Sequence, residues 1–143
     1  MSGNYSALLR RRAESMIRLA EKLLGEEEHD LAVLNAEYAA QLYVKSVLYR
    51  LTGEEWRGHS VRTLLGAVAL VAGEGGLKDV AEVVIEFTRR NRRSLAELDE
   101  AHTRSIYGVF EYSKEQAEAL VSIAKTVISL MKNIESKVFG GGL

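Results

Sequence analysis

The sequence contains no cysteine and no proline among its 143 residues. Without cysteine the protein cannot be a disulfide-stabilised module, a zinc finger or a zinc ribbon, and it has no thiol nucleophile. Proline makes up about 5% of ordinary sequences and is excluded from helix interiors, so its absence favours long helices that end at glycines. The longest apolar run, residues 64–72, has nine residues, whereas a membrane span needs about 20. We therefore expect an all-α protein that makes no contact with a membrane.

Length and composition predict a single domain over residues 1–143. A chain of this size buries about 68–70% of the surface that it exposes when unfolded, which is enough for a hydrophobic core. Its 19 basic and 20 acidic residues nearly cancel, so the net charge does not point to any class of partner. Near the N-terminus, Glu14, Arg18 and Glu21 interrupt what would be the apolar core of a signal peptide. We expect a cytoplasmic protein.

Apolar residues recur at helical spacing through most of the chain. We expect an N-terminal helix in residues 1–25, helices over 30–51 and 61–72, a fourth after the loop at 73–76, a last helix after Ser113, and a flexible tail at 140–143. The expected N-caps are Asp30, Ser60 and Ser113, the last in a capping box with Gln116, while Gly25 and Gly53 end the first two helices. The third helix is apolar on nearly every side, which predicts a central position. The pattern predicts an up-and-down antiparallel bundle of about five helices, related to four-helix bundles.

The sequence offers no arrangement of metal ligands. Its three histidines, His29, His59 and His102, lie on separate segments without the i, i+4 spacing of a helical metal site. The acidic run at 26–30 lacks the alternating oxygen ligands and the glycine of a calcium loop. The glycine-rich loop at 73–76 is not followed by the Lys-Ser/Thr of a phosphate loop. We therefore predict no metal and no cofactor.

Four arginines lie within five residues, at positions 89, 90, 92 and 93. If one helix runs through them, Arg89, Arg92 and Arg93 share a face. Arginine stays charged and presents a planar fork of donors that suits phosphate, so this cluster is a candidate contact for a nucleotide or RNA. The alternative is a solvated helix face whose charge is balanced by acidic residues nearby, such as Glu86.

Two histidines are candidates for chemistry. His59 directly precedes the expected cap Ser60, where the positive end of a helix favours a neutral imidazole that can act as a hydrogen-bond partner or base. It could equally be an ordinary loop residue. His102 is the stronger candidate because Arg104 and Tyr107 follow it closely, which combines an imidazole, a guanidinium and a phenol within six residues.

The aromatic residues after His102 have two interpretations. Tyr107, Phe110 and Tyr112 belong either to the hydrophobic core or to a dimer interface. Gly108 among them indicates an irregular connection to the last helix. The end of the preceding helix is left open by the pattern, because helical character continues through Leu95 and Leu98.

Three segments carry motifs in a fixed order. Residues 38–45 have an aromatic residue followed at three and seven positions by Gln41 and Lys45, and residues 58–65 place His59 and Ser60 at the start of the next helix. Residues 103–117 run from an arginine and aromatic residues into an alanine-rich last helix. In this order and spacing, over about residues 28–135, the chain resembles the HEPN domain family, named for nucleotide binding in higher eukaryotes and prokaryotes.

The resemblance implies a helical bundle that commonly forms dimers and often acts beside a small nucleotidyltransferase in a toxin–antitoxin pair. Many members cleave RNA without a metal and carry an arginine, then four to six residues, then a histidine. Here Arg93 and His102, and likewise Arg50 and His59, have eight residues between them, so this motif is absent. Nine steps along one helix amount to a rise of about 13.5 Å and end half a turn out of phase. Only a helix break near residues 98–102 or a partner subunit would bring Arg93 to His102.

The interpretation we favour is a homodimeric binding module for a nucleotide, RNA or a nucleotidyltransferase partner. The alternatives are a structural subunit of a homodimer or hetero-complex, and a metal-independent ribonuclease in which a histidine acts as general acid–base and an arginine stabilises the phosphate charge. The candidate catalytic residues are His102 and Arg104, and the candidate phosphate-binding residues are Arg89, Arg92, Arg93, Tyr107 and His59.

Overall fold

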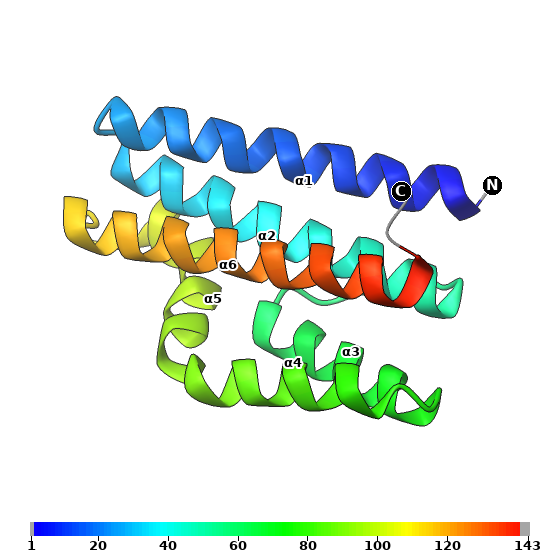
Figure 1. The fold of residues 1–143 in the computed structure, drawn as a ribbon. Coiled ribbons are helices and arrows are strands. Elements are labelled where there is room, and N and C mark those ends of the chain that lie inside the picture. The colour runs from blue at the N-terminus through cyan, green and yellow to red at the C-terminus, as the bar shows by residue number, and fades with distance from the viewer. Residues whose placement is uncertain (1, 141–143) are drawn as a thin grey trace.

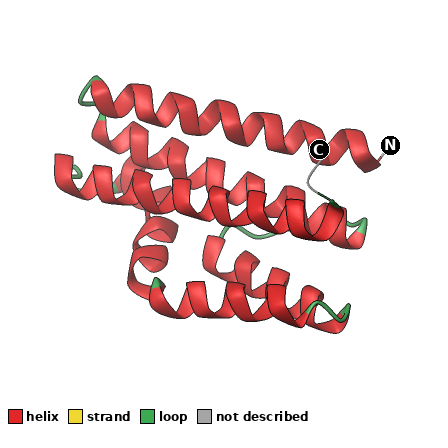
Figure 2. Ribbon diagram, in the orientation of Figure 1, coloured by secondary structure: helices red, strands yellow, loops and turns green. Residues whose placement is uncertain are grey.

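The computed structural model describes residues 2–140, and all regular structure within that range is helical (Figure 2). The six helices are α1 (Ser2–Gly25), α2 (His29–Thr52), α3 (Val61–Glu74), α4 (Lys78–Arg90), α5 (Arg92–Tyr107) and α6 (Lys114–Phe139). The all-α prediction is confirmed, with six helices in place of about five. Residues 141–143 of the predicted tail lie outside the described range. Among residues 2–140, no helix combines the length and the hydrophobicity that a membrane span requires.

The central helix is α2, which packs against α1, α6, α3 and α5 (Figure 1). Its alanines at 32, 36, 39 and 40 are fully buried, and such small side chains let neighbouring helices approach closely on several sides. The prediction that the helix at 61–72 would be central is wrong. That helix, α3, pairs with α4 in an outer layer, and Leu70 on it is 63% exposed.

The long helices α2 and α6 run in the same direction, and α1 runs opposite to both (Figure 1). Contacts at both ends fix this alignment. The backbone N–H of Tyr112, just before α6, donates to the Asp30 carboxylate at the start of α2 over 2.8 Å. Near the other end, the Tyr43 hydroxyl of α2 donates to Glu135 of α6 over 2.6 Å. The predicted N-cap role of Asp30 is wrong, because α2 starts one residue earlier and the Asp30 carboxylate serves Tyr112 instead.

The predicted caps Ser60 and Ser113 and the predicted end at Gly53 are confirmed, whereas α3 continues to Glu74, two residues into the loop predicted at 73–76. The Ser60 hydroxyl accepts the Thr63 N–H at the start of α3, and Ser113 forms a full capping box with Gln116 at the start of α6. Gly53 follows α2 with φ of 77°, a left-handed conformation that favours glycine. These helix ends could be predicted from the sequence because each depends on residues within one helical turn.

Residues 78–107 form two helices because the chain turns at Asn91, which has φ of −111° and ψ of 23°. The Asn91 side chain donates to the carbonyl of Phe87 over 2.9 Å, so it competes with the helix for a backbone acceptor. The break places Arg89 on α4 and Arg92 on α5. The predicted shared face of the arginine cluster is therefore wrong.

Candidate functional site

The structure brings His59 and His102 together. His59 lies in the loop before α3, His102 lies on α5, and their rings stack with centroids 5.5 Å apart and planes 6° apart. The Tyr38 ring of α2 contacts His102 edge-on, with centroids 5.5 Å apart. The two histidines were separate candidates in the sequence, and here they form one site, which we call the imidazole pair.

His59 is held by Gln41 of α2. The Gln41 amide nitrogen donates to the Glu37 Oε2 atom over 3.1 Å and to the His59 carbonyl over 3.4 Å, which turns the amide oxygen toward the His59 ring. That oxygen lies 3.3 Å from Nδ1 of His59. Because an amide oxygen can only accept, Nδ1 of His59 carries the proton in this contact. Neutral His59 therefore presents Nε2 as a hydrogen-bond acceptor, on a side chain that is exposed to solvent.

Behind His102 lies Glu37, a fully buried carboxyl group on α2. Gln41 donates to one of its oxygens, but among the described residues its Oε1 atom has no hydrogen-bond partner. The Nδ1 atom of His102, also buried and without a partner in this part of the chain, lies 3.9 Å from that oxygen. The rest of the His102 side chain reaches the surface, where it is 39% exposed.

The burial of Glu37 raises its pKa from 4.5 to about 7. The hydrogen bond from Gln41 works in the opposite direction, the negative charge of Asp99 raises the pKa further, and Lys45 lowers it. Protonated and ionised forms of Glu37 are therefore both populated near neutral pH. A carboxyl group with this property beside a surface imidazole marks a candidate functional site.

The positive end of α3 is occupied by Asp99 of α5. Its carboxylate accepts the Ser60 hydroxyl at 2.7 Å and the backbone N–H of Val61 at 2.6 Å. A third donor is the N–H of Arg62 at 3.4 Å. This carboxylate balances the helix dipole beside His59 and fills the place that a ligand anion would otherwise take at the helix end. A ligand at the imidazole pair must therefore bind through side chains.

Arg104 does not lie beside His102. Arg104 follows His102 by two positions, which is a rotation of about 200° around the helix, so the two side chains leave α5 on opposite sides. The Arg104 guanidinium lies over the Tyr112 ring, 4.3 Å from its centroid. Arg104 and Tyr107 line a shallow hollow of about 530 Å³ on the outer side of α5, together with Asp99, Glu100, Thr103 and Gly108. The hollow holds two acidic groups against one guanidinium.

The arginine cluster divides at the Asn91 turn. Arg89 and Arg90 on α4 both pair with Glu86, which agrees with the alternative of a balanced solvated face. On α5, Arg92 and Arg93 are exposed and form no ion pair with any residue in the described range. The helix break that the sequence left open thus lies before Arg93, and it separates the cluster into two paired and two unpaired arginines.

In both pairs with eight intervening residues, Arg93 with His102 and Arg50 with His59, the arginine does not contact the histidine. Arg93 and His102 stay on one continuous helix, α5, so they remain about half a turn out of phase. The guanidinium of Arg50 donates to Glu135 over 3.2 Å and lies over the Phe139 ring. The ribonuclease motif that is absent from the sequence is thus not rebuilt within the chain by folding.

The aromatic residues after His102 divide between core and surface. Tyr112 is buried, with 4% exposure, and belongs to the core. The end of α5 and the following loop expose four apolar side chains by 54–89%, which we call the apolar strip: Ile106, Tyr107, Val109 and Phe110. The core interpretation is confirmed for Tyr112, whereas Tyr107 and Phe110 are exposed and the dimer interface stays a prediction.

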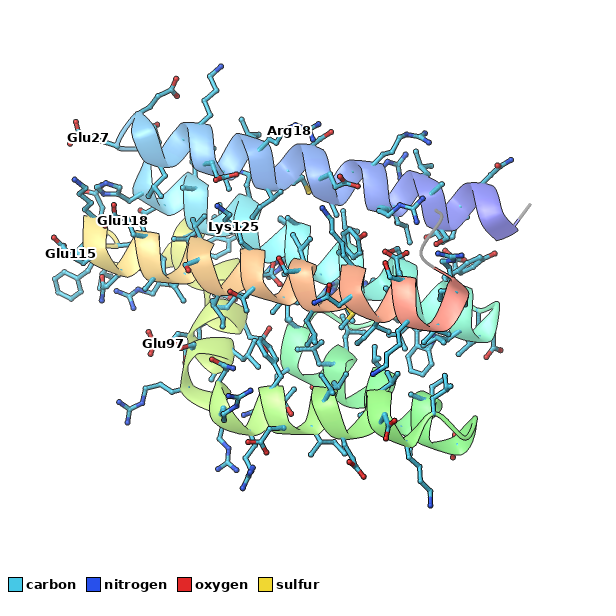
Figure 3. The ribbon with its side chains drawn as sticks, in the orientation of Figure 1. Arg18, Glu27, Glu97, Glu115, Glu118 and Lys125 are labelled. Atoms are coloured by element: carbon cyan, nitrogen blue, oxygen red, sulfur yellow. The ribbon has the colours of Figure 1, made fainter. Side chains whose placement is uncertain are left out.

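A larger groove, of about 950 Å³, lies between the end of α1 and the first half of α6. The ion pair of Lys125 with Glu21, at 2.8 Å, lies across it, and Glu118 on α6 adds another charge (Figure 3). Its lining mixes both signs of charge, and the predicted site residues do not line it. Across residues 2–140, His, Asp and Glu side chains do not gather in any group of three or more that is suited to hold a metal ion.

Sequence reasoning missed Glu37 and Asp99, the two carboxyl groups of the site. A signal for Glu37 exists, because this charged residue occupies a core position of α2 between Val33 and Ala40, which are buried. Such a position is rare for an acidic residue unless it has partners. No comparable local signal marks Asp99, whose partners are 37–39 residues away.

Comparison with known proteins identifies the family. No curated protein and no solved structure gives a significant match to the chain. The family model described as HEPN domain matches residues 6–134, a range that contains His59, His102, Glu37 and Asp99. The resemblance predicted from the three motifs is thereby confirmed, and the chain belongs to the HEPN domain family.

Proposed function

We propose that the protein is a binding module for a nucleotide or RNA, and that the imidazole pair holds a phosphate group of this ligand. The observation that carries the proposal is the stacking of His59 on His102 at the surface, with Gln41 and Glu37 behind the two rings. Imidazoles change charge near neutral pH and donate to phosphate oxygens when protonated. Since two stacked cations repel each other, an anion that bridges both rings stabilises their protonated forms.

An exposed arginine supports a ligand with more than one phosphate. Arg92 precedes His102 by ten residues on α5, which places it about 15 Å away along the axis and about 80° around it. It is exposed and is not paired with any acidic residue within residues 2–140. A strand of RNA that reaches the imidazole pair can therefore also contact Arg92, and phosphate contacts of this kind make affinity depend on salt.

The test is a binding titration with a fluorescent single-stranded RNA and with ATP, at salt from about 50 to 200 mM. His59→Ala and His102→Ala are each expected to weaken binding at least about fivefold, the loss of one charge-assisted hydrogen bond. His29→Ala is the matched control, because His29 lines the groove between α1 and α6, which neither His59 nor His102 lines. Equal affinity of all three variants and the wild type would exclude the imidazole pair as the ligand site.

A second candidate is metal-independent cleavage of RNA at the same site. The observation that favours it is the different environment of the two rings: Gln41 leaves His59 with a free acceptor nitrogen, whereas His102 faces a carboxyl group that can carry a proton. A base and an acid side by side are what general acid–base cleavage of a phosphodiester needs. Cleavage in EDTA that is lost in both His59→Ala and His102→Ala would support this activity, and cleavage that survives in both would refute it.

We also propose that the protein assembles through the apolar strip. Four neighbouring apolar side chains that are more than half exposed form a patch typical of a protein contact. We propose a homodimer, with a small nucleotidyltransferase in a toxin–antitoxin-type pair as the alternative occupant. Light scattering of the purified protein distinguishes the two occupants. A dimer would support the homodimer, whereas a monomer would favour the nucleotidyltransferase partner, which is absent from the purified sample.

A further inference from the structure

Two buried polar atoms without partners face each other at the site. The Oε1 atom of Glu37 and the Nδ1 atom of His102 are 3.9 Å apart, and within the described range neither makes a hydrogen bond. Leaving a buried polar atom unpaired costs about 1–3 kcal/mol, so two such atoms within a side-chain adjustment of each other are expected to share a proton. A closer approach by about 1 Å gives a normal hydrogen bond.

We propose that Glu37 and His102 share one proton, and that Glu37 is a positioning residue that passes this proton to His102 when a phosphate binds at the imidazole pair. The transfer on phosphate binding rests on the proposed function, whereas the shared proton does not. In the step, the O–H bond at Oε1 of Glu37 breaks and an N–H bond forms at Nδ1 of His102. A neutral acid and a neutral imidazole become a carboxylate and an imidazolium, so the total charge is unchanged.

The surroundings of Glu37 make its proton available at neutral pH. Burial raises the pKa of Glu37 to about 7, and the nearby charges partly cancel, since Asp99 of α5 raises this pKa and Lys45 of α2 lowers it. From the α3 side, the backbone N–H groups of Val61 and Arg62 are taken up by Asp99. The other groups around the pair are Gln41, which donates to the second Glu37 oxygen, and the rings of Tyr38 and His59, which contact His102.

A bound phosphate drives the proton across. An anion near the outer edge of His102 favours the imidazolium, and the carboxylate left behind at Glu37 then accepts the Nδ1–H. The ring is fixed with Nδ1 inward, and Nε2 donates outward to the ligand. Without Glu37, His102 must take its proton from water and has no buried anion to balance its charge.

The shared proton is tested in the ligand-free protein by NMR, following the Glu37 carboxyl carbon and the ring nitrogens of His102 against pH. The two signals are expected to change over the same pH range, as coupled groups do. Glu37→Gln is expected to remove the part of the His102 change that coincides with the Glu37 titration. Glu37→Asp, which keeps a carboxyl group, is expected to restore it at least in part. Glu97→Gln, an exposed position on α5, is the control and leaves it unchanged. A His102 signal that is the same in wild type and Glu37→Gln overturns the proposal.

The transfer is tested by calorimetry of ATP binding in two buffers with different heats of ionisation, which counts the protons taken up. Glu37→Gln is expected to take up as much as about one proton per ligand more than the wild type at the same pH, since any proton that His59 gains comes from solvent in both proteins. Equal uptake by both proteins overturns the transfer. If wild type does not bind ATP or RNA at all, the proposed function fails, while the NMR experiment still decides whether the proton is shared. Urea unfolding of each variant verifies that it is folded.

Discussion

Tyr43 donates a 2.6 Å hydrogen bond to the buried carboxylate of Glu135, which joins the central helix α2 to α6. The other carboxylate oxygen accepts from Arg10 of α1 at 3.1 Å and from Arg50 of α2 at 3.2 Å. Burial, followed by the hydrogen bond to Glu135, raises the pKa of Tyr43 far above its usual range, so it remains a donor at every working pH. One carboxylate thus ties together the three long helices.

Removing this carboxylate should destabilise the fold. Glu135→Ala leaves the buried Tyr43 hydroxyl without its acceptor and two arginines without their counter-ion, and we expect it to lower the free energy of unfolding by about 2–4 kcal/mol. Glu135→Gln keeps an acceptor for Tyr43 and should cost less. Urea denaturation measures both, with the exposed Glu118→Ala on the same helix as the control. A Glu135→Ala protein as stable as this control would show that the network contributes nothing.

Glu37 should make the protein less stable as the pH rises. The pKa of Glu37 is about 7 in the folded protein, whereas a glutamate exposed to water in the unfolded chain has a pKa of 4.5. Between pH 4.5 and pH 7 the folded state therefore binds more protons than the unfolded state. Stability is therefore highest below about pH 4.5 as far as this group is concerned. It falls as the pH rises to about 7, by about 3 kcal/mol in total at 1.36 kcal/mol for each pKa unit.

The variant that isolates this effect is Glu37→Gln, because glutamine keeps the shape and a hydrogen-bond acceptor for Gln41. Urea unfolding at pH 5 and pH 8 should show that the wild type loses more stability between the two values than Glu37→Gln does. The difference between the two curves removes the contribution of the titrating groups that are not coupled to Glu37. Parallel curves would mean that Glu37 ionises in the folded protein as it does in water.

The two halves of the arginine cluster should differ in their effect on RNA binding. Arg92→Ala removes an exposed, unpaired charge on the helix that carries His102, and we expect weaker binding with a salt dependence reduced by about one charge. Arg89→Ala removes a charge already paired with Glu86 and should change little. Anisotropy titrations at several salt concentrations compare the two. Equal losses would point to a general attraction over the whole surface instead of a defined contact.

The helix ends were predictable from the sequence where the signal is local, as at Ser60, Gly53 and the Ser113 capping box. The turn at Asn91 was not, because asparagine also continues helices. The break here combines the Asn91 side-chain bond to the Phe87 carbonyl with the burial of Phe87 and Leu95 on separate helices, and the sequence pattern shows neither. Both histidines of the site were identified as candidates, but their contact was not. It depends on α5 folding back across α2 and on the loop before α3, which are interactions between segments far apart in sequence.

The apolar strip should control assembly. Val109 and Phe110 are 89% and 78% exposed, and burying side chains of this size against a second surface contributes about 1.5–3 kcal/mol each. We expect the double variant Val109→Asp with Phe110→Asp to shift a dimer to monomer over a concentration series in light scattering. Because both positions lie in the loop outside the helices, the fold should persist, as circular dichroism would show. Leu70→Asp, at an apolar position 63% exposed on α3, is the matched control and should leave assembly intact. Dissociation by both variants would indicate that association does not depend on the strip.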